Sequence, residues 1–122
     1  MQRMLIVDDE PKICNFLGQF FQERGFTVET TTSPLEAVER ASATSPEIML
    51  VDIRMHPIDG LEVLRRVRAS APEVHVIIVS AYDEAEIAQQ ALQLGALDYV
   101  TKPLVLNPHW WAERFFWFPP AR

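Results

Sequence analysis

This sequence of 122 residues lacks a pair of cysteines, a long apolar run and an excess of basic residues. It has one cysteine, Cys14, so no disulfide can form within the chain and nothing points to an oxidising compartment. The apolar run at residues 4–7 is far too short for a signal peptide or a membrane span. The 11 Lys and Arg are outnumbered by 17 Asp and Glu, and the net charge of −6 argues against nonspecific nucleic-acid binding. We therefore expect a cytoplasmic protein that neither enters membranes nor binds nucleic acid directly through this domain.

The residues that are present suit one folded α/β domain. With 48% hydrophobic and 23% charged residues, the composition is that of a globular protein large enough to bury one core. Short β-like runs alternate five times with helical stretches, and the apolar stripe over residues 13–21 has helical spacing. The expected strands cover residues 4–7, 26–31, 48–51, 74–79 and 97–101.

Helix boundaries are marked by capping residues. Gly25 and Gly95 follow two of the helical stretches, and Ser33 precedes a proline at the start of another. A third helix is expected to start near Asp59, and Asp83 is expected to cap a fourth. Because the strands are apolar throughout and separated by helices, we predict a doubly wound (βα)5 domain with a five-stranded parallel sheet.

Chemically active side chains follow four of the five expected strands. Asp8 and Asp9 follow the first strand, Asp52 the third, Ser80 the fourth and Lys102 the fifth. In open parallel sheets, ligands bind outside the carboxyl ends of the strands. Three carboxylates there repel one another, and an all-oxygen site relieved by a hard cation favours Mg²⁺. A carboxylate beside this metal can attack a phosphoryl group while the lysine and the hydroxyl contact its oxygens.

Each of these residues also has an ordinary structural interpretation. A single aspartate after a strand usually forms a turn or caps a helix, and Asp8 and Asp9 could cap the first helix. Lys102 with the proline after it could be a solvated turn. Coincidence becomes a poor explanation when four strands bring complementary groups to the same edge.

Five segments resemble the CheY-like receiver domains of two-component response regulators over residues 3–103. The resemblance implies a flavodoxin-like sheet of order 2-1-3-4-5. The segments are VDDEP at 7–11, DIRM at 52–55, DG at 59–60, VSA at 79–81 and GALDYVTKP at 95–103.

The resemblance implies that Asp52 is the phosphoacceptor. It would receive phosphate from the phosphohistidine of a sensor histidine kinase, or from a small donor such as acetyl phosphate. Mg²⁺ would be held by Asp9, Asp52 and the backbone carbonyl of Arg54, with Asp8 acting largely through water. The chain would then be a signalling switch with slow autodephosphorylation that controls an output partner or domain, and not a turnover enzyme.

The resemblance also implies how the switch works. Lys102 would pair with the phosphoryl group, and the peptide bond before Pro103 would be cis. Ser80 would move toward the phosphate, and Tyr99 would turn inward behind it. For Tyr99, plain packing against the sheet is an equally good interpretation, as solvent exposure is for Arg54.

One loop departs from the family pattern. The family usually has proline directly after the methionine at position 55, whereas here His56 intervenes and the proline is Pro57. The distance in sequence from Asp52 to Gly60 is unchanged, so we expect a loop that bends differently without being longer.

The C-terminal segment, residues 104–122, departs further. Six of the twelve aromatic residues lie between positions 110 and 118, where the family usually has an amphipathic fifth helix. We therefore separate a receiver core at 1–103 from an atypical segment at 104–122 with a disrupted final helix. The segment could form a homodimer or partner interface together with the last helices, be altered or truncated sequence, or be a poorly ordered end.

Other classes of protein fit less well. A haloacid-dehalogenase-type phosphatase needs a second aspartate where this chain has Arg54, and a flavodoxin-like cofactor binder needs a glycine-rich phosphate loop after the first strand. A degenerate receiver would lack an acidic residue or the lysine, and none is missing. Both a stand-alone receiver and a fragment of a longer regulator fit the sequence, and DIRM at 52–55 mildly favours the fragment.

Overall fold

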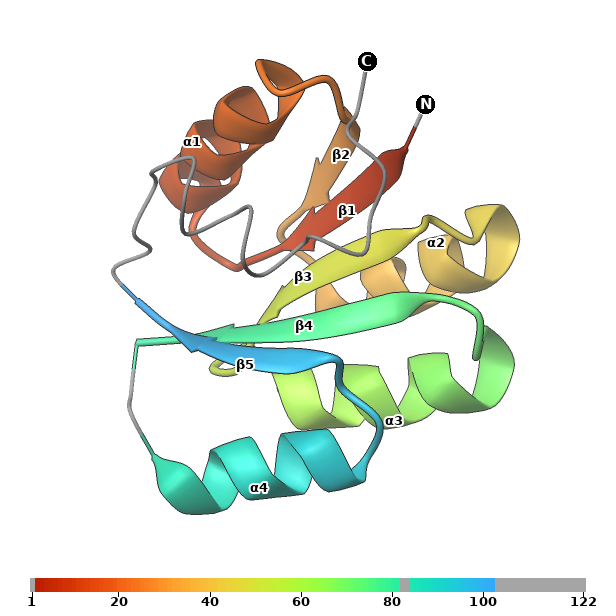
Figure 1. The fold of residues 1–122 in the computed structure, drawn as a ribbon, viewed down its shortest axis with the longest axis vertical. Coiled ribbons are helices and arrows are strands. Elements are labelled where there is room, and N and C mark those ends of the chain that lie inside the picture. Colours follow the sequence, from red (N-terminus) through yellow and green to blue (C-terminus); the bar gives the residue numbers. More distant parts are fainter. Residues whose placement is uncertain (1, 82–83, 103–122) are drawn as a thin grey trace.

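The computed structural model describes residues 2–81 and 84–102 and confirms the predicted architecture (Figure 1). Five parallel strands form one sheet in the order β2-β1-β3-β4-β5. The elements are β1 (Arg3–Val7), α1 (Pro11–Gln22), β2 (Thr27–Thr31), α2 (Pro34–Thr44), β3 (Ile48–Asp52), α3 (Gly60–Ser70), β4 (His75–Ser80), α4 (Ala85–Gln93) and β5 (Asp98–Thr101). No helix among these residues is long and apolar enough to cross a membrane.

Helices cover both faces of the sheet, and a separate hydrophobic cluster lies on each face. In Figure 1, α1 packs on one face while α2, α3 and α4 pack on the other. One cluster joins strand residues such as Met49 to Val63 of α3 and Ala91 of α4. The other joins Ile48 to Phe21 of α1. Because β1, β3 and β4 bury side chains on both faces, their residues are almost all apolar.

The edge strand β2 differs from the prediction that every strand is apolar throughout. Its sequence is TVETT, and its residues alternate between more and less exposed positions until Thr31. An edge strand pairs on one side only, here with β1, and lies partly in solvent. Phe26, predicted to start this strand, instead donates its backbone N–H to Phe21 O at 3.1 Å as part of the turn that ends α1.

Most predicted helix caps are confirmed. Ser33 Oγ accepts the backbone N–H of Glu36, and Asp59 Oδ1 accepts that of Glu62. Gly25 has a φ of 94° and Gly95 a φ of 103°, which favour glycine after a helix. At α4 the N-cap position belongs to Glu84, whose side chain makes no capping hydrogen bond.

Several predictions lie outside the described residues. These are the capping residue Asp83, the expected cis bond before Pro103 and the aromatic-rich segment 104–122 with the boundary before it. The loop altered by His56 is described, and the peptide bond between His56 and Pro57 is cis.

Candidate functional site

The sheet order brings the predicted site residues to one edge. The strands β1, β3, β4 and β5 are successive neighbours, so Asp8, Asp52, Ser80 and Lys102 all emerge at carboxyl ends. Asp8 is 3% exposed, Asp52 7% and Ser80 0%. Burial of three polar side chains in one place is costly unless they are paired or bind a ligand, which singles out this edge as the candidate site.

Lys102 bridges the two buried carboxylates. Its Nζ lies 2.8 Å from Asp8 Oδ2 and 3.3 Å from Asp52 Oδ1. Its backbone N–H donates to Ser80 O at 2.5 Å, which ties the end of β5 to the end of β4. One ammonium therefore contacts two carboxylates that stand 44 residues apart in the chain, since both strands end at this edge.

The electrostatics of the pocket leave negative charge in excess. Burial, followed by the charge of Asp8, raises the pKa of Asp52 from 3.8 to about 6, although Lys102 opposes the shift. Burial also lowers the pKa of Lys102, but the hydrogen bond and charge of Asp8 and the charge of Asp52 outweigh it, so that pKa is raised. At neutral pH, Lys102 is thus charged and Asp52 is mostly ionised.

A compact group of carboxylates lies directly after β1, at the same edge of the sheet. Oxygens of Asp8, Asp9 and Glu10 all lie within 4.8 Å of one another, and Asp9 and Glu10 are exposed. Asp8 Oδ1 accepts the backbone N–H of Glu10 at 3.0 Å, which sets the path of this loop. Sequence reasoning named Asp8 and Asp9 but missed Glu10, whose only signal is its place next to them. Asp52 is connected to this group through Lys102.

This donor set fits a hard divalent cation. The group offers carboxylate oxygens only, as Mg²⁺ prefers, and two of the three residues are open to solvent, as an ion that keeps bound water requires. The pKa of Asp52, raised partly by Asp8, reflects the same excess of negative charge that a cation would relieve.

Gly60 sets the backbone path directly after Asp52. A Cβ at this position would lie 2.3 Å from Asp52 O and 2.9 Å from Ile53 Cα, so no side chain fits. The backbone N–H of Gly60 donates to Ile53 O at 2.9 Å, which ties the start of α3 to the end of β3. Sequence reasoning used this glycine as a motif residue and did not find the close contact that requires it.

Two further residues lie on elements next to the site. Tyr99 is half-buried and packs against the cluster beneath α2, α3 and α4, which agrees with the packing interpretation and leaves its switching role a prediction. Cys14 Sγ donates to Asp8 O at 3.3 Å from its buried position on α1. Burial, followed by the charge of Asp8, raises the pKa of Cys14, so it remains a thiol at neutral pH.

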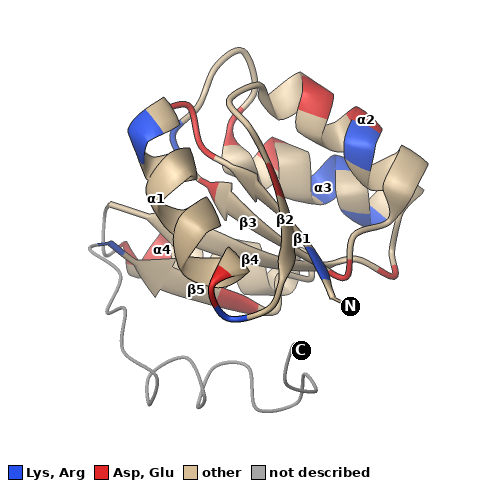
Figure 2. Cartoon of the chain, turned by 90° about the horizontal axis from the view of Figure 1, so that it is seen from above, with Lys and Arg blue, Asp and Glu red and all other residues tan. Residues whose placement is uncertain are grey.

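Several surface charges on α2 and α3 are paired with opposite charges. Figure 2 shows acidic and basic residues side by side over α2 and α3. Arg40 pairs with Glu36 on α2 at 3.0 Å, and Arg66 pairs with Glu62 on α3 at 2.9 Å. These acidic side chains thus have basic partners of their own, whereas Asp8 and Asp52 share Lys102.

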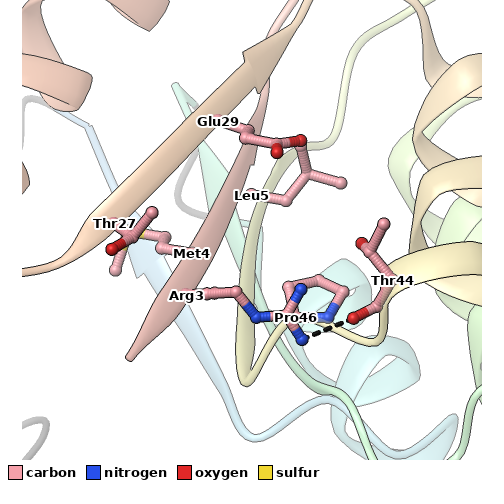
Figure 3. A pocket seen from close by; sticks show the side chains of 7 residues that line it. All are labelled: Arg3, Met4, Leu5, Thr27, Glu29, Thr44 and Pro46. Atoms are coloured by element: carbon pink, nitrogen blue, oxygen red, sulfur yellow. Dashed lines mark hydrogen bonds between the residues drawn. The ribbon is translucent and has the colours of Figure 1, made fainter. Parts of the chain in front are cut away.

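A small hollow at the opposite edge offers no comparable chemistry. It measures about 20 Å³, enough for about one water molecule, and lies near the starts of β1 and β2 and the end of α2 (Figure 3). Arg3 donates across it to Thr44 O. Its size excludes a metabolite site.

Fold and site together define the class. A parallel sheet of order 2-1-3-4-5 with its charged pocket at the carboxyl ends of the strands is a flavodoxin-like α/β domain. The sequence model described as "Response regulator receiver domain" matches residues 4–108. The chain belongs to that family and is a CheY-like receiver domain of two-component signalling, as the sequence motifs predicted.

Individual relatives agree with this assignment. The chain is 36% identical over 107 residues to Regulatory protein AtoC of Escherichia coli (strain K12), which covers 88% of this chain and 23% of that protein. It is 31% identical over 106 residues to Sporulation initiation phosphotransferase F of Bacillus subtilis (strain 168), with 87% of this chain and 86% of that protein covered. The chain thus spans less than a quarter of the length of the first relative and most of the second.

Solved structures give the same result. The CheX-CheY-BeF3-Mg²⁺ complex from Borrelia burgdorferi contains a chain that superposes with a TM-score of 0.88 at 27% identity. The superposition covers 97% of this chain and 90% of the other.

Proposed function

We propose that this receiver domain takes a phosphoryl group on Asp52 from the phosphohistidine of a sensor histidine kinase in a Mg²⁺-dependent reaction. The phosphorylated domain then controls an output partner or domain until slow autodephosphorylation resets it. The observation that carries the proposal is the position of Asp52, buried at the end of the central strand β3 with Lys102 Nζ at 3.3 Å.

The side chains have distinct tasks in this reaction. An ionised Asp52 oxygen attacks phosphorus and forms a phosphorus–oxygen bond while the phosphorus–nitrogen bond to the imidazole breaks, and the imidazole leaves with its proton. The pKa of Asp52, about 6, leaves it ionised at neutral pH. Lys102 offsets charge on the phosphoryl oxygens, and Ser80 donates a hydrogen bond to one of them.

The metal is assigned to the residues the sequence indicated. Asp8, Asp9, Asp52 and the Arg54 carbonyl would hold Mg²⁺, and Glu10 lies close enough to Asp8 and Asp9 to contribute. Bound Mg²⁺ supplies positive charge that neutralises the transferred group. The Borrelia burgdorferi CheY solved with BeF3 and Mg²⁺ supports this assignment for a chain of the same fold.

Incubation with Mg²⁺ and acetyl phosphate tests the proposal. Intact mass should show one added phosphoryl group on the parent protein and none on Asp52→Ala. The matched control is Glu73→Ala, which removes an exposed carboxylate far from the pocket and should leave labelling unchanged. An unlabelled parent, or equal labelling of Asp52→Ala, would contradict the assignment.

The partners are part of the same proposal. A sensor histidine kinase is the phosphodonor, which places the domain in the cytoplasm, and the domain accepts phosphate without acting as a turnover enzyme. Homodimerisation through the last helices or the aromatic segment is tested by light scattering coupled to size exclusion. A strictly monomeric species at high concentration would argue against it.

A further inference from the structure

An ion pair connects the loop after β3 to the start of α4. Arg54 Nη2 lies 2.5 Å from Glu84 Oε1, although the two residues are 30 positions apart in the chain. Arg54 follows the acceptor Asp52 by two residues, and Glu84 follows Ser80 by four. The pair therefore connects the segment that carries the acceptor to the segment that follows the hydroxyl.

A cleft of about 340 Å³ lies beside this ion pair, so few other contacts join the two segments there. It lies between the loop after β3 and α4, and its walls include Met55, Leu61 and Ile87 as well as Arg54. Packing across the cleft is therefore incomplete, and the ion pair joins the two segments beside it. The backbone on either side can change its separation at low cost if the pair breaks.

The helix α4 buries fewer residues than α3, although Ile87 packs partly against the core. Ala91 is its buried residue, whereas α3 buries Gly60, Val63, Leu64 and Val67. The Glu84 side chain does not cap its own helix, so its described contact is with Arg54. The pair with Arg54 is therefore a contact from the loop after β3 that adds to the partial packing of the first turn of α4.

We propose that Glu84 is a positioning residue that holds α4 in its unphosphorylated position through Arg54, and that phosphorylation of Asp52 draws Arg54 away from it. This inference rests on the proposed function. The phosphoryl group carries a charge of about −1.5 to −2, in place of the single negative charge of the ionised carboxylate, and competes with Glu84 for the Arg54 guanidinium. Arg54 then has an anionic partner both before and after phosphorylation. In the phosphorylated form α4 loses its ion pair with the loop after β3.

The size of the effect follows from the exposure of the pair. The Arg54 and Glu84 side chains are 57% and 43% exposed, so breaking the pair changes an equilibrium constant by about twofold to fivefold. Glu84→Gln removes this ion pair before activation, so the free energy of breaking it is no longer required. The concentration of beryllofluoride that half-saturates the domain should fall by that factor in Glu84→Gln.

A double-mutant cycle isolates the pair from the other effects of charge. Beryllofluoride with Mg²⁺ is titrated into the parent, Glu84→Gln, Arg54→Gln and the double variant, with the amide signals of Ser80 and Ala91 as readout. In the Arg54→Gln background, Glu84→Gln should no longer shift the midpoint. Raising the salt concentration should bring the midpoints of the parent and Glu84→Gln together, a response that a purely structural role would not give.

The matched control is Glu86→Gln. Glu86 has the same charge in the first turn of α4 and makes no ion pair with a described residue, so its loss reproduces the changes in net charge and helix dipole alone. Equal shifts in Glu84→Gln and Glu86→Gln, with a parent that responds, would overturn the inference and leave the proposed function intact. A parent that does not respond, or a response that persists in Asp52→Ala, would overturn both.

Discussion

Charged side chains are exposed at the amino end of the sheet and buried at its carboxyl end. At the amino end, Arg3 lies 3.8 Å from Glu47 and donates to Thr44 O and Ser45 O, and the charged side chains are more than a third exposed. At the carboxyl end, Lys102 is the cation that contacts two carboxylates, both almost fully buried. The first arrangement satisfies its charges with solvent and nearby partners. The second retains an excess of negative charge that a bound cation would neutralise.

This difference distinguishes exposed ion pairs, which have no chemical role, from buried charged groups that serve a reaction. Exposed pairs such as Arg3–Glu47 contribute little to stability and define no chemistry. A buried group with a displaced pKa, such as Asp52 with its pKa of about 6, costs stability and persists where it has a task. Substitutions at the two ends should therefore differ in kind as well as in size.

The largest expected contrast is in the response to phosphorylation. Lys102→Ala should keep metal binding but lose the conformational response to beryllofluoride, because it removes the charge that we propose to contact the phosphoryl group. Arg3→Ala removes a cation from the other end and should respond like the parent. Amide chemical shifts of Ser80 report the outcome, and a normal response in Lys102→Ala would remove the distinction between the two ends.

A substitution of glycine tests how rigidly the carboxyl end is built. Gly60→Ala should destabilise the fold by about 3 kcal/mol, because its Cβ would lie 2.3 Å from Asp52 O and the backbone must shift. Gly18→Ala is the matched control in the middle of α1, where the nearest contact would be an ordinary 3.5 Å to Thr30 Cγ2. It should stabilise the protein by about 0.5–1 kcal/mol through helix propensity. Urea unfolding measures both, and equal effects would contradict the close contact.

The pH dependence of stability isolates the buried carboxyl. Because the pKa of Asp52 is raised in the folded state, its stabilising contribution is complete below 3.8 and is lost as the pH rises through about 6. Without metal, Asp52→Asn should therefore be more stable than the parent by about 2 kcal/mol at pH 7.5, within the roughly 3 kcal/mol that this displacement allows. The advantage should shrink toward pH 4.5. Denaturant unfolding in the presence of a chelator gives the comparison, and a less stable variant at pH 7.5 would reverse the sign we assign.

The smallest effect is expected at the amino end. Glu47→Gln should change the free energy of unfolding by less than about 0.5 kcal/mol, because its pair with Arg3 is exposed and the backbone N–H of Arg3 keeps an acceptor. Urea unfolding at low and high salt measures it. A loss above about 2 kcal/mol would show that charge is used structurally at this end as well.

The sequence predicted the fold and the convergence of the site for one physical reason. Parallel strands end at a common edge, so residues that follow them, such as Asp8, Asp52 and Lys102, meet whatever the path of the chain between them. The edge strand β2 was described less well, because its partial exposure depends on its place in the sheet and not on its own composition.

Contacts that depend on the path of a loop could not be predicted. The proximity of Glu10 to Asp9, the pair between Arg54 and Glu84 and the cap of α4 all require the loop backbone in three dimensions. No periodicity in the sequence carries that information. The close packing of Gly60 on Asp52 O belongs to the same class, although its motif marked the position.

The buried thiol on α1 has a practical consequence for spectroscopy. Cys14 is 3% exposed, its pKa is raised and its Sγ donates to Asp8 O, so maleimide dyes should react with it slowly in the native protein. A cysteine introduced at an exposed position such as Glu86 can then be labelled selectively in the otherwise natural sequence. A single dye placed on α4 in this way can report changes around that helix without first building a cysteine-free background.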